Sequence, residues 1–273
     1  MLKTKTPDFY LLHTWAKKGV AYLHPQGKIG TAKLVKNLHL NDGMHVLEFG
    51  CGTGATLADL SLIPGLNLNG VDISSSMIHT AKQRLRFCGI YHDVQLKLIQ
   101  PGEKLPFPEA SMDVVYAESV LAIVDELILP EILIEILRVL KPGGRFALLD
   151  AIWKDECPAE QIAGINKLCM MHFGMVQSLA NPGYKKDWEH TFKKAGFRII
   201  SSQDLSEEKD NLCIHQTNRL SSIFTKLKKT AVLFAPRFWF GQIKTFVLIK
   251  KWHKHDGDHL KNYLFLLEKP HTD

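Results

Sequence analysis

Short apolar runs alternate with helical patterns through most of this 273-residue chain, and that alternation restricts the fold more than any other feature. Alternation of this kind predicts βαβ units, in which parallel strands form one sheet that helices cover on both faces. Strands are expected at residues 44–50, 67–72, 94–99, 112–117, 145–151, 197–205 and 262–268. The sequence therefore predicts a doubly wound α/β fold with a mostly parallel sheet.

Helical segments lie between these strands and on both sides of them. Helices are expected at residues 9–21, 28–38, 56–62, 75–87, 129–140, 159–173 and 185–195. The first two precede the sheet and are expected to fold over its binding edge, and an unusually long connection separates the last two strands. The predicted domains are an N-terminal helical cap at 1–40, a core at 41–205 with a helical segment at 152–184, an insertion at 206–260, and the last strand with the tail at 261–273.

A glycine-rich turn, Gly50-Cys51-Gly52-Thr53-Gly54, follows the first expected strand and opens a helix. Glycine lets the backbone pass close to a ligand, and the free N–H groups at a helix start face that ligand. The turn is therefore expected to bind a small molecule with a polar head. With Ala55 it also satisfies the looser dinucleotide fingerprint GxGxxA, so the glycines alone do not separate a dinucleotide site from other ligand sites or from an ordinary tight turn.

Two acidic residues narrow the choice of ligand. Glu48, two residues before the first glycine, suits a ligand ammonium group and is unfavourable beside a pyrophosphate. Asp72 ends the second strand about 20 residues after the turn, where a carboxylate accepts both hydroxyls of a ribose. Asp72 alone would fit NAD equally well. Together, the two acids describe a ligand with a ribose at one end and a cationic amino acid at the other.

Four motifs follow one another in the order and spacing of a known family: VLEFGCGTG (46–54), LNGVDIS (68–74), EKLPFPEASMDVVYAESVL (103–121) and LRVLKPGGRFALLD (137–150). Through them the sequence resembles the class I S-adenosylmethionine-dependent methyltransferases, in particular the branch similar to ubiquinone/menaquinone and sterol methyltransferases. The resemblance covers about residues 30–150, with weaker echoes at AGF (195–197) and YLFLLEKP (263–270). It implies a Rossmann-like fold of seven strands with the last antiparallel, and S-adenosyl-L-methionine as cofactor.

The resemblance also assigns roles at the cofactor site. It implies that the methionine and ribose end is lined by Gly50, Gly52 and Gly54, that the ribose hydroxyls bind Asp72, and that the adenine packs on Ile73 and Met77. Many relatives carry Gly-Asp-Ala-Glu before the LPF motif, with the Asp at the adenine amino group, whereas this chain has Gln100-Pro101-Gly102-Glu103. Because that Asp is missing, adenine recognition falls to the Gly102 backbone or to Glu103 or Gln100.

Two residues are candidates for acting on the methyl acceptor. Methyl transfer is an in-line displacement at a sulfonium, so a base is needed only if the acceptor must lose a proton. Glu118 follows the fourth strand, at the carboxyl edge where ligands bind. It is a candidate base or cation-stabilising carboxylate. Alternatively, it contacts the cofactor's amino acid or is a carboxylate in the first turn of a helix, where the helix dipole favours it. His24 is a base near neutral pH if the N-terminal helices fold over that edge, and otherwise a capping or packing residue.

The net charge of +6 comes from one segment. Residues 212–255 hold nine Lys and Arg and no Asp or Glu, so the rest of the chain carries a net charge of −3. Aromatic and apolar residues recur between the lysines, which predicts amphipathic helices that form a lid over an apolar pocket. A basic amphipathic stretch is also attracted to anionic lipid. A membrane-peripheral protein that contacts the membrane transiently is therefore an open alternative.

Composition argues against several other classes. The chain has no run of about 18 uncharged apolar residues and no secretory pattern at its start, so a cytoplasmic location is predicted. Its five cysteines are far apart and never form CxxC, which argues against a disulfide framework and a zinc knuckle. Residues 253–259 crowd His and Asp together, but a solvated turn accounts for them, so no metal is expected.

The sequence thus predicts a methyltransferase that modifies an O, N or C centre of a small, apolar acceptor. One alternative is an RNA methyltransferase in which residues 212–255 follow phosphates. The chain shows neither an RNA-binding module nor an Asn/Asp-Pro-Pro-aromatic tetrapeptide after the fourth strand, so nucleic acid is disfavoured as a partner. The other is a membrane-peripheral binding module with a vestigial cofactor site, which the intact glycines, Glu48 and Asp72 disfavour.

Overall fold

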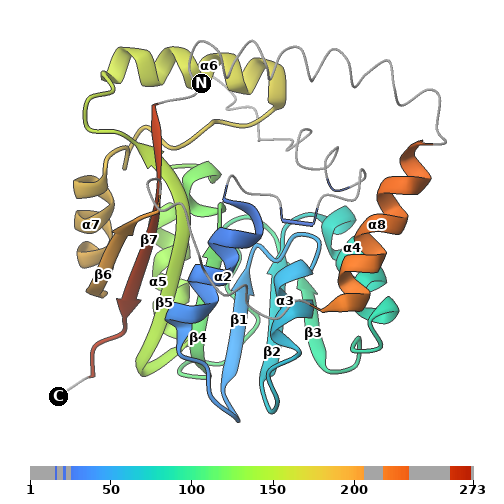
Figure 1. Ribbon diagram of the computed structural model, residues 1–273. Coiled ribbons are helices and arrows are strands. Elements are labelled where there is room, and N and C mark those ends of the chain that lie inside the picture. The colour runs from blue at the N-terminus through green and yellow to red at the C-terminus, as the bar shows by residue number, and fades with distance from the viewer. Residues whose placement is uncertain (1–15, 17–20, 23–25, 206–217, 234–258, 272–273) are drawn as a thin grey trace.

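The computed structural model describes residues 16, 21–22, 26–205, 218–233 and 259–271 (Figure 1). Its strands are β1 (His45–Phe49), β2 (Asn67–Asp72), β3 (Val94–Leu98), β4 (Met112–Glu118), β5 (Leu140–Trp153), β6 (Arg198–Asp204) and β7 (Leu260–Glu268). Its helices are α2 (Gly27–Leu38), α3 (Ala55–Leu60), α4 (Ser75–Phe87), the 3-10 helix η1 (Leu121–Ile123), α5 (Leu129–Val139), α6 (Ala159–Phe173), α7 (Lys185–Lys194) and α8 (Arg219–Leu233). The helix expected at 9–21 lies almost wholly outside the described residues.

The seven strands form one sheet in the order β3-β2-β1-β4-β5-β7-β6. The first five strands pair in parallel, and β7 runs antiparallel to both β5 and β6. This confirms the doubly wound, mostly parallel sheet with an antiparallel last strand. The strand order reverses between β1 and β4, and ligands bind in such sheets outside the carboxyl ends of the strands at this switch point.

Strand β5 differs most from its sequence prediction, because it begins at Leu140 and not at residue 145. The Lys-Pro-Gly-Gly segment after α5 continues into the strand: Leu140 pairs with Met112, and the register then shifts before Arg145 pairs with Val114. Such a shift is typical of a β-bulge, in which extra residues bend a strand without ending it. The N–H of Gly143 donates to the carbonyl of Lys269, which keeps the segment in the sheet (2.8 Å).

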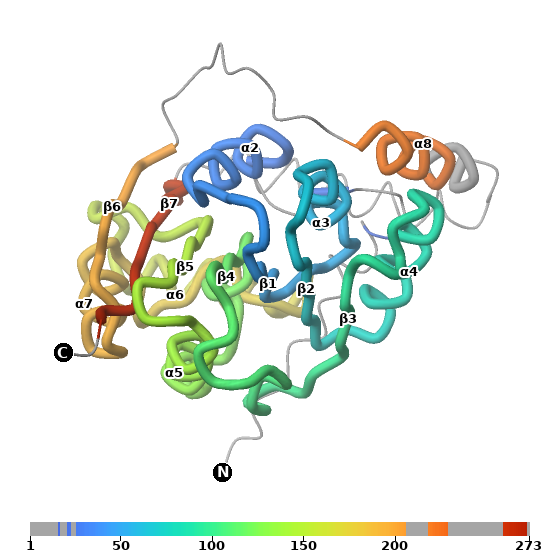
Figure 2. The backbone as a smooth tube through the Cα atoms, turned by 90° about the horizontal axis from the view of Figure 1, so that it is seen from below, coloured from blue at the N-terminus to red at the C-terminus, as the bar shows by residue number. Residues whose placement is uncertain are grey.

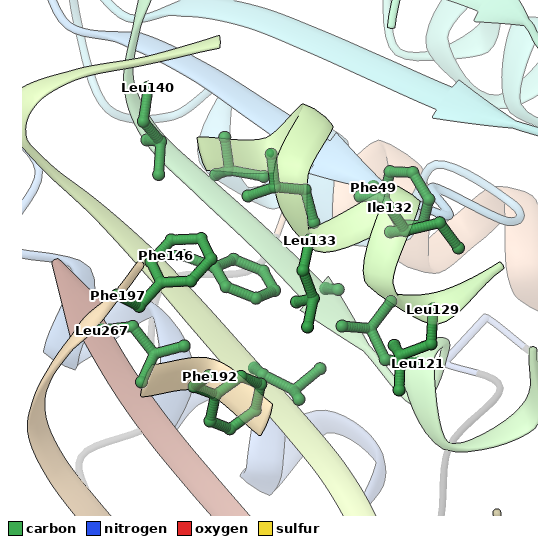
Figure 3. Close-up of a cluster of buried hydrophobic side chains, with 14 of the residues drawn as sticks. Phe49, Leu121, Leu129, Ile132, Leu133, Leu140, Phe146, Phe192, Phe197 and Leu267 are labelled. Carbon is green, nitrogen blue, oxygen red and sulfur yellow. The ribbon is translucent and has the colours of Figure 1, made fainter. Parts of the chain in front are cut away.

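Helices cover both faces of the sheet (Figure 2). On one face, α5 and α7 enclose a core that includes Phe146 and Phe192 (Figure 3). On the other face, α2, α3 and α4 enclose a second core with Leu34 from α2. Side chains alternate along a strand, so Glu48 shares the second face with Val46. The acidic residue before the glycine turn therefore points toward the layer formed by α2 and α3.

Two helices lie outside these two layers. Helix α6 crosses the end of the sheet at which the parallel strands finish and packs there with Trp153 (Figure 1). Helix α8, the described part of the insertion predicted at 206–260, lies against α3 and α4 (Figures 1 and 2). No helix among the described residues has the length and hydropathy of a membrane-spanning segment. The four described cysteines are buried and form no disulfide: Cys51, Cys88, Cys157 and Cys169.

Candidate functional site

The glycine turn takes a backbone path that only glycine follows without strain. Gly50, Gly52 and Gly54 have φ values of +79°, +48° and +69°. The N–H groups of Gly50 and Cys51 both donate to the carbonyl of Val71, at 2.9 Å each, which ties the turn to β2. A Cβ atom at Gly50 would lie 2.4 Å from Cγ2 of Val120. The turn therefore brings its backbone against the end of β4, where a side chain would not fit.

Asp72 joins this turn to the end of β2. Its Oδ2 accepts a hydrogen bond from the N–H of Gly52, and its Oδ1 accepts one from the N–H of Ser74, both at 2.8 Å. Ser74 in turn caps α4, because its hydroxyl accepts from the N–H of Met77 at 3.3 Å. These two bonds hold the Asp72 carboxylate between the glycine turn and the start of α4.

Glu48 lies below the turn on β1, directly opposite Tyr116 on β4. Its side chain is 5% exposed, and its Oε2 has no hydrogen-bond partner within the described chain. The hydroxyl of Tyr116 interacts with the same carboxyl group. Burial raises the pKa of Glu48 well above its ordinary value, and the charge of Glu118 raises it further. A buried acceptor without a partner is unfavourable, which makes Glu48 a group that a bound cation would stabilise.

Glu118 ends β4 and is held from two sides. Its Oε2 accepts from the hydroxyl of Thr31 on α2 at 2.6 Å, and its Oε1 accepts from the hydroxyl of Thr56 on α3 at 2.8 Å. Both threonines are buried. Hydrogen bonds from two sides hold a carboxylate in one orientation and occupy both of its oxygens. The geometry therefore makes Glu118 a carboxylate fixed in place by its neighbours.

Four carboxylates gather around the glycine turn. Glu118, Asp72 and Asp59 each raise the pKa of Glu48, which shows that their charges act on the same small region. Burial, and then the charges of Asp72 and Glu48, also raise the pKa of the Cys51 thiol within the turn. Negative charge at this position disfavours a pyrophosphate and favours a cationic ligand. The structure thus removes the ambiguity that the GxGxxA fingerprint leaves in the sequence.

The residues expected at the adenine differ in their surroundings. Ile73 follows Asp72 with its side chain 41% exposed, whereas Met77 is buried at 4%. Gly102 is exposed and has a φ of +74°. Glu103 closes its own turn: its carboxylate Oε2 accepts from the N–H of Gln100 at 2.8 Å. Ile73 therefore offers an open apolar surface beside Asp72, while one oxygen of Glu103 is already engaged.

The structure also shows which residues of the site the sequence reasoning missed. His24 and residues 253–258 of the cluster at 253–259 lie outside the described residues, and within the described part no group of three or more His, Cys, Asp or Glu has metal-binding geometry. Thr31 and Thr56 lie outside every quoted motif. Tyr116 lies within the motif at 103–121 but was given no role, and its signal was its position two residues before Glu118 on the same face of the strand.

Known methyltransferases are similar to this chain in sequence. Residues 47–148 match a family described as a methyltransferase domain. The demethylmenaquinone methyltransferase of Symbiobacterium thermophilum is 31% identical and is covered over 72% of its length by 60% of this chain. The sterol 4-C-methyltransferase strm-1 of Caenorhabditis elegans is 24% identical, over 58% of its length and 73% of this chain. The chain spans between 58% and 65% of the length of the first curated relatives that it matches.

A solved structure extends the similarity in fold to nearly the whole chain. Phosphoethanolamine N-methyltransferase 2 of Haemonchus contortus, in complex with S-adenosyl-L-methionine, superposes with a TM-score of 0.67 at 18% identity, covering 99% of this chain and 59% of its own. Together with the acid-lined glycine turn, this sheet defines a class I, Rossmann-like methyltransferase. The chain carries an S-adenosylmethionine-dependent methyltransferase domain, and S-adenosyl-L-methionine is its cofactor.

Proposed function

We propose that this chain transfers a methyl group from S-adenosyl-L-methionine to an O, N or C centre of a small, apolar acceptor. The observation that carries the proposal is Glu48, a carboxylate that is 5% exposed, whose Oε2 has no hydrogen-bond partner in the described chain, beside a glycine turn lined by further acids. A ligand that carries an ammonium group and a sulfonium group supplies the missing positive charge. When bound, this cofactor supplies an electrophilic methyl group.

Different residues of the chain are proposed to bind different parts of the cofactor. The glycine turn offers backbone N–H groups and close approach, and Asp72 lies at the end of β2 beside the turn that it braces, where a carboxylate accepts ribose hydroxyls. Ile73 presents an exposed apolar side chain for an adenine, and Met77 is buried in the first turn of α4. The proposed cofactor residues are therefore Glu48, Gly50, Gly52, Gly54, Asp72, Ile73, Met77, Gly102 and Glu103.

Glu118 and His24 take different roles in this proposal. Both oxygens of Glu118 accept threonine hydroxyls, which supports a fixed charge near the cofactor's amino acid and methyl group more than proton abstraction. His24 remains the candidate base for acceptors that must lose a proton, and it lies outside the described residues.

The apolar character of the acceptor rests on two observations. Helix α6 crosses the carboxyl edge of the sheet (Figure 1), and its Leu168 and Met171 side chains are 41% and 65% exposed. A helix with uncovered apolar side chains near a ligand edge suits an apolar pocket wall. In addition, the names of two relatives, a sterol and a demethylmenaquinone methyltransferase, state lipophilic acceptors for those proteins.

Membrane contact and the lid belong to the same proposal. Helix α8 leaves Leu220, Ile223 and Leu227 exposed at 44%, 44% and 55%, next to the exposed cations Arg219 and Lys226. Apolar side chains beside basic ones are attracted to anionic lipid, which supports transient contact with a membrane that holds the acceptor. The rest of the proposed lid lies outside the described residues.

A labelling experiment tests the proposed function. The protein is incubated with methyl-tritiated S-adenosyl-L-methionine and, separately, with a lipid extract, an aqueous metabolite fraction and total RNA, with Asp72→Ala as the inactive control. We expect label in the lipid extract alone. Label in RNA alone would establish the RNA alternative, and cofactor binding without label in any fraction would favour a binding module. Sedimentation with anionic against zwitterionic vesicles tests the membrane contact.

A further inference from the structure

A buried arginine connects the glycine turn to the insertion, and the proposed methyl transfer assigns it no task. Arg84 lies on α4 with its side chain 1% exposed. Its Nε donates to the carbonyl of Thr53, inside the glycine turn, at 2.9 Å. Its Nη1 donates to the hydroxyls of Ser221 and Thr225 on α8, each at 2.9 Å, and to the carbonyl of Ser221 at 3.1 Å. One guanidinium therefore bonds both the turn and α8.

The ring of Phe224 completes this arrangement on α8. The guanidinium carbon of Arg84 lies 5.0 Å from the ring centroid, a cation–π contact, and the same ring packs at 5.7 Å from the ring of Phe87 on α4. Burial lowers the pKa of Arg84 from its ordinary value, yet arginine stays charged in proteins. A buried charge held by this many acceptors is costly to release, because each lost partner leaves a polar group unsatisfied.

Asp59 provides a second link between α8 and the cofactor side. The carboxylate of Asp59 on α3 accepts from the N–H of Asn218 at 2.8 Å and from the hydroxyl of Tyr22. The Asn218 side chain caps α8 by accepting from the N–H of Ser221 at 3.1 Å. Thr53 also donates its hydroxyl to the carbonyl of Ala21 at 2.8 Å. The start of α8 and residues 21–22 thus attach to the turn and to the helix that follows it.

The position of Thr53 explains why these bonds matter for the ligand. Its two neighbours are Gly52, whose N–H is held by Asp72, and Gly54, which begins α3 in a left-handed conformation. Glycines on both sides leave the Thr53 peptide free to rotate unless side chains hold it. Arg84 holds the Thr53 carbonyl, and α8 holds Arg84 in turn.

We propose that Arg84 is a positioning residue that couples the docking of α8 to the shape of the cofactor-binding turn, so that S-adenosyl-L-methionine and α8 stabilise each other's bound positions. The inference rests on the proposed placement of the cofactor at this turn. Coupling between two sites is reciprocal: docking of α8 strengthens cofactor binding by the same factor by which the cofactor strengthens docking. The insertion that is proposed to reach the acceptor thereby responds to the cofactor.

The test uses the full-length protein and S-adenosylhomocysteine as a non-reactive probe. The variant Ser221→Ala/Thr225→Val removes two acceptors of Arg84 without touching the turn. We expect its dissociation constant for the probe, measured by calorimetry, to rise about tenfold. In hydrogen exchange, the probe should slow the exchange of the α8 amides in the wild type. In the variant, the probe should not change the exchange of these amides. A stabilising role for α8 that is independent of the turn would change neither quantity.

Gln83→Ala is the matched control. It removes the Lys228–Gln83 contact between the same two helices, at 3.1 Å, and leaves Arg84 with its partners. Its probe affinity and α8 protection should stay within about twofold of the wild type. If circular dichroism shows that the double variant is unfolded, Thr225→Val alone removes one bond and is expected to give a smaller change in the same direction.

Two results would overturn the inference. One is a folded α8 variant that binds the probe as tightly as the wild type, and the other is a wild type whose α8 exchange is unaffected by the probe. Failure of the proposed function looks different: the wild type itself would then bind neither S-adenosyl-L-methionine nor S-adenosylhomocysteine, and the placement of the cofactor would fall together with the coupling built on it.

Discussion

Glu48 is expected to destabilise the ligand-free protein and to strengthen cofactor binding, so Glu48→Gln should separate the two effects. The wild-type carboxylate is 5% exposed, has an Oε2 without a hydrogen-bond partner in the described chain, and lies in the field of three other acids. Glutamine keeps the shape and one carbonyl oxygen but removes the charge. Its amide can also donate to the hydroxyl of Tyr116, which lies opposite on β4.

The size of both effects follows from general hydrogen-bond energies. A buried polar group without a partner costs about 1–3 kcal/mol, and a change of 1 kcal/mol moves the melting temperature of a protein of this size by about 2–4 °C. Taking about 2 kcal/mol, the Tm of ligand-free Glu48→Gln should rise by about 4–8 °C. Loss of a charge-assisted bond to the cofactor, about 1.5–3 kcal/mol, should weaken binding by about 10- to 150-fold.

The pH dependence follows from the raised pKa of Glu48, which burial causes first and Glu118 second. A carboxyl group with a folded pKa above its unfolded value binds its proton more tightly in the folded state. Its contribution to stability is full below the unfolded pKa and is lost as pH rises through the folded pKa. The Tm advantage of Glu48→Gln should therefore grow with pH above about 4.5, while wild-type cofactor affinity also grows, because deprotonation creates the charge that the cation needs.

Differential scanning fluorimetry across this pH range and calorimetry with S-adenosylhomocysteine measure the two effects. Tyr116→Phe is the matched control, since it removes a neighbouring buried polar atom that carries no charge. It leaves the Glu48 charge in place, so the fall in Tm with rising pH should persist, and probe affinity should change much less than in Glu48→Gln. The reasoning is refuted if Glu48→Gln is less stable than the wild type above neutral pH and binds the probe equally well.

Three further substitutions test the site. Asp72→Asn should fold normally and weaken S-adenosylhomocysteine binding by about 1.5–3 kcal/mol in calorimetry, and unchanged affinity would remove its ribose role. Glu118→Gln should lower cofactor affinity more than the rate at saturating cofactor; a rate loss of about 10² or more would instead place it on the acceptor. Gly50→Ala should destabilise by about 1–3 kcal/mol or more in denaturant titration, since its Cβ would meet Val120 at 2.4 Å, and adding Val120→Ala should recover only part of the loss.

Local sequence patterns determined the elements and the cofactor motif. The strand at 67–72 and the helix at 75–87 have the predicted bounds because turn residues and a serine cap mark their ends. The acidic and glycine residues of the turn were recognisable because they lie within a few positions of one another. The start of β5 was predicted wrongly, since Pro and Gly normally end elements and only pairing with β4 and Lys269 keeps that segment in the sheet.

Only the tertiary structure decided the chemical state of the site. Glu118 reads as a free carboxylate in the sequence, yet its partners Thr31 and Thr56 lie 87 and 62 residues away. Arg84 reads as an ordinary helix cation, yet it is buried beneath Ser221, which is 137 residues away. Periodicity and motifs record contacts between near neighbours along the chain. The basicity of an acid and the freedom of a turn depend instead on which distant groups burial brings within hydrogen-bonding distance.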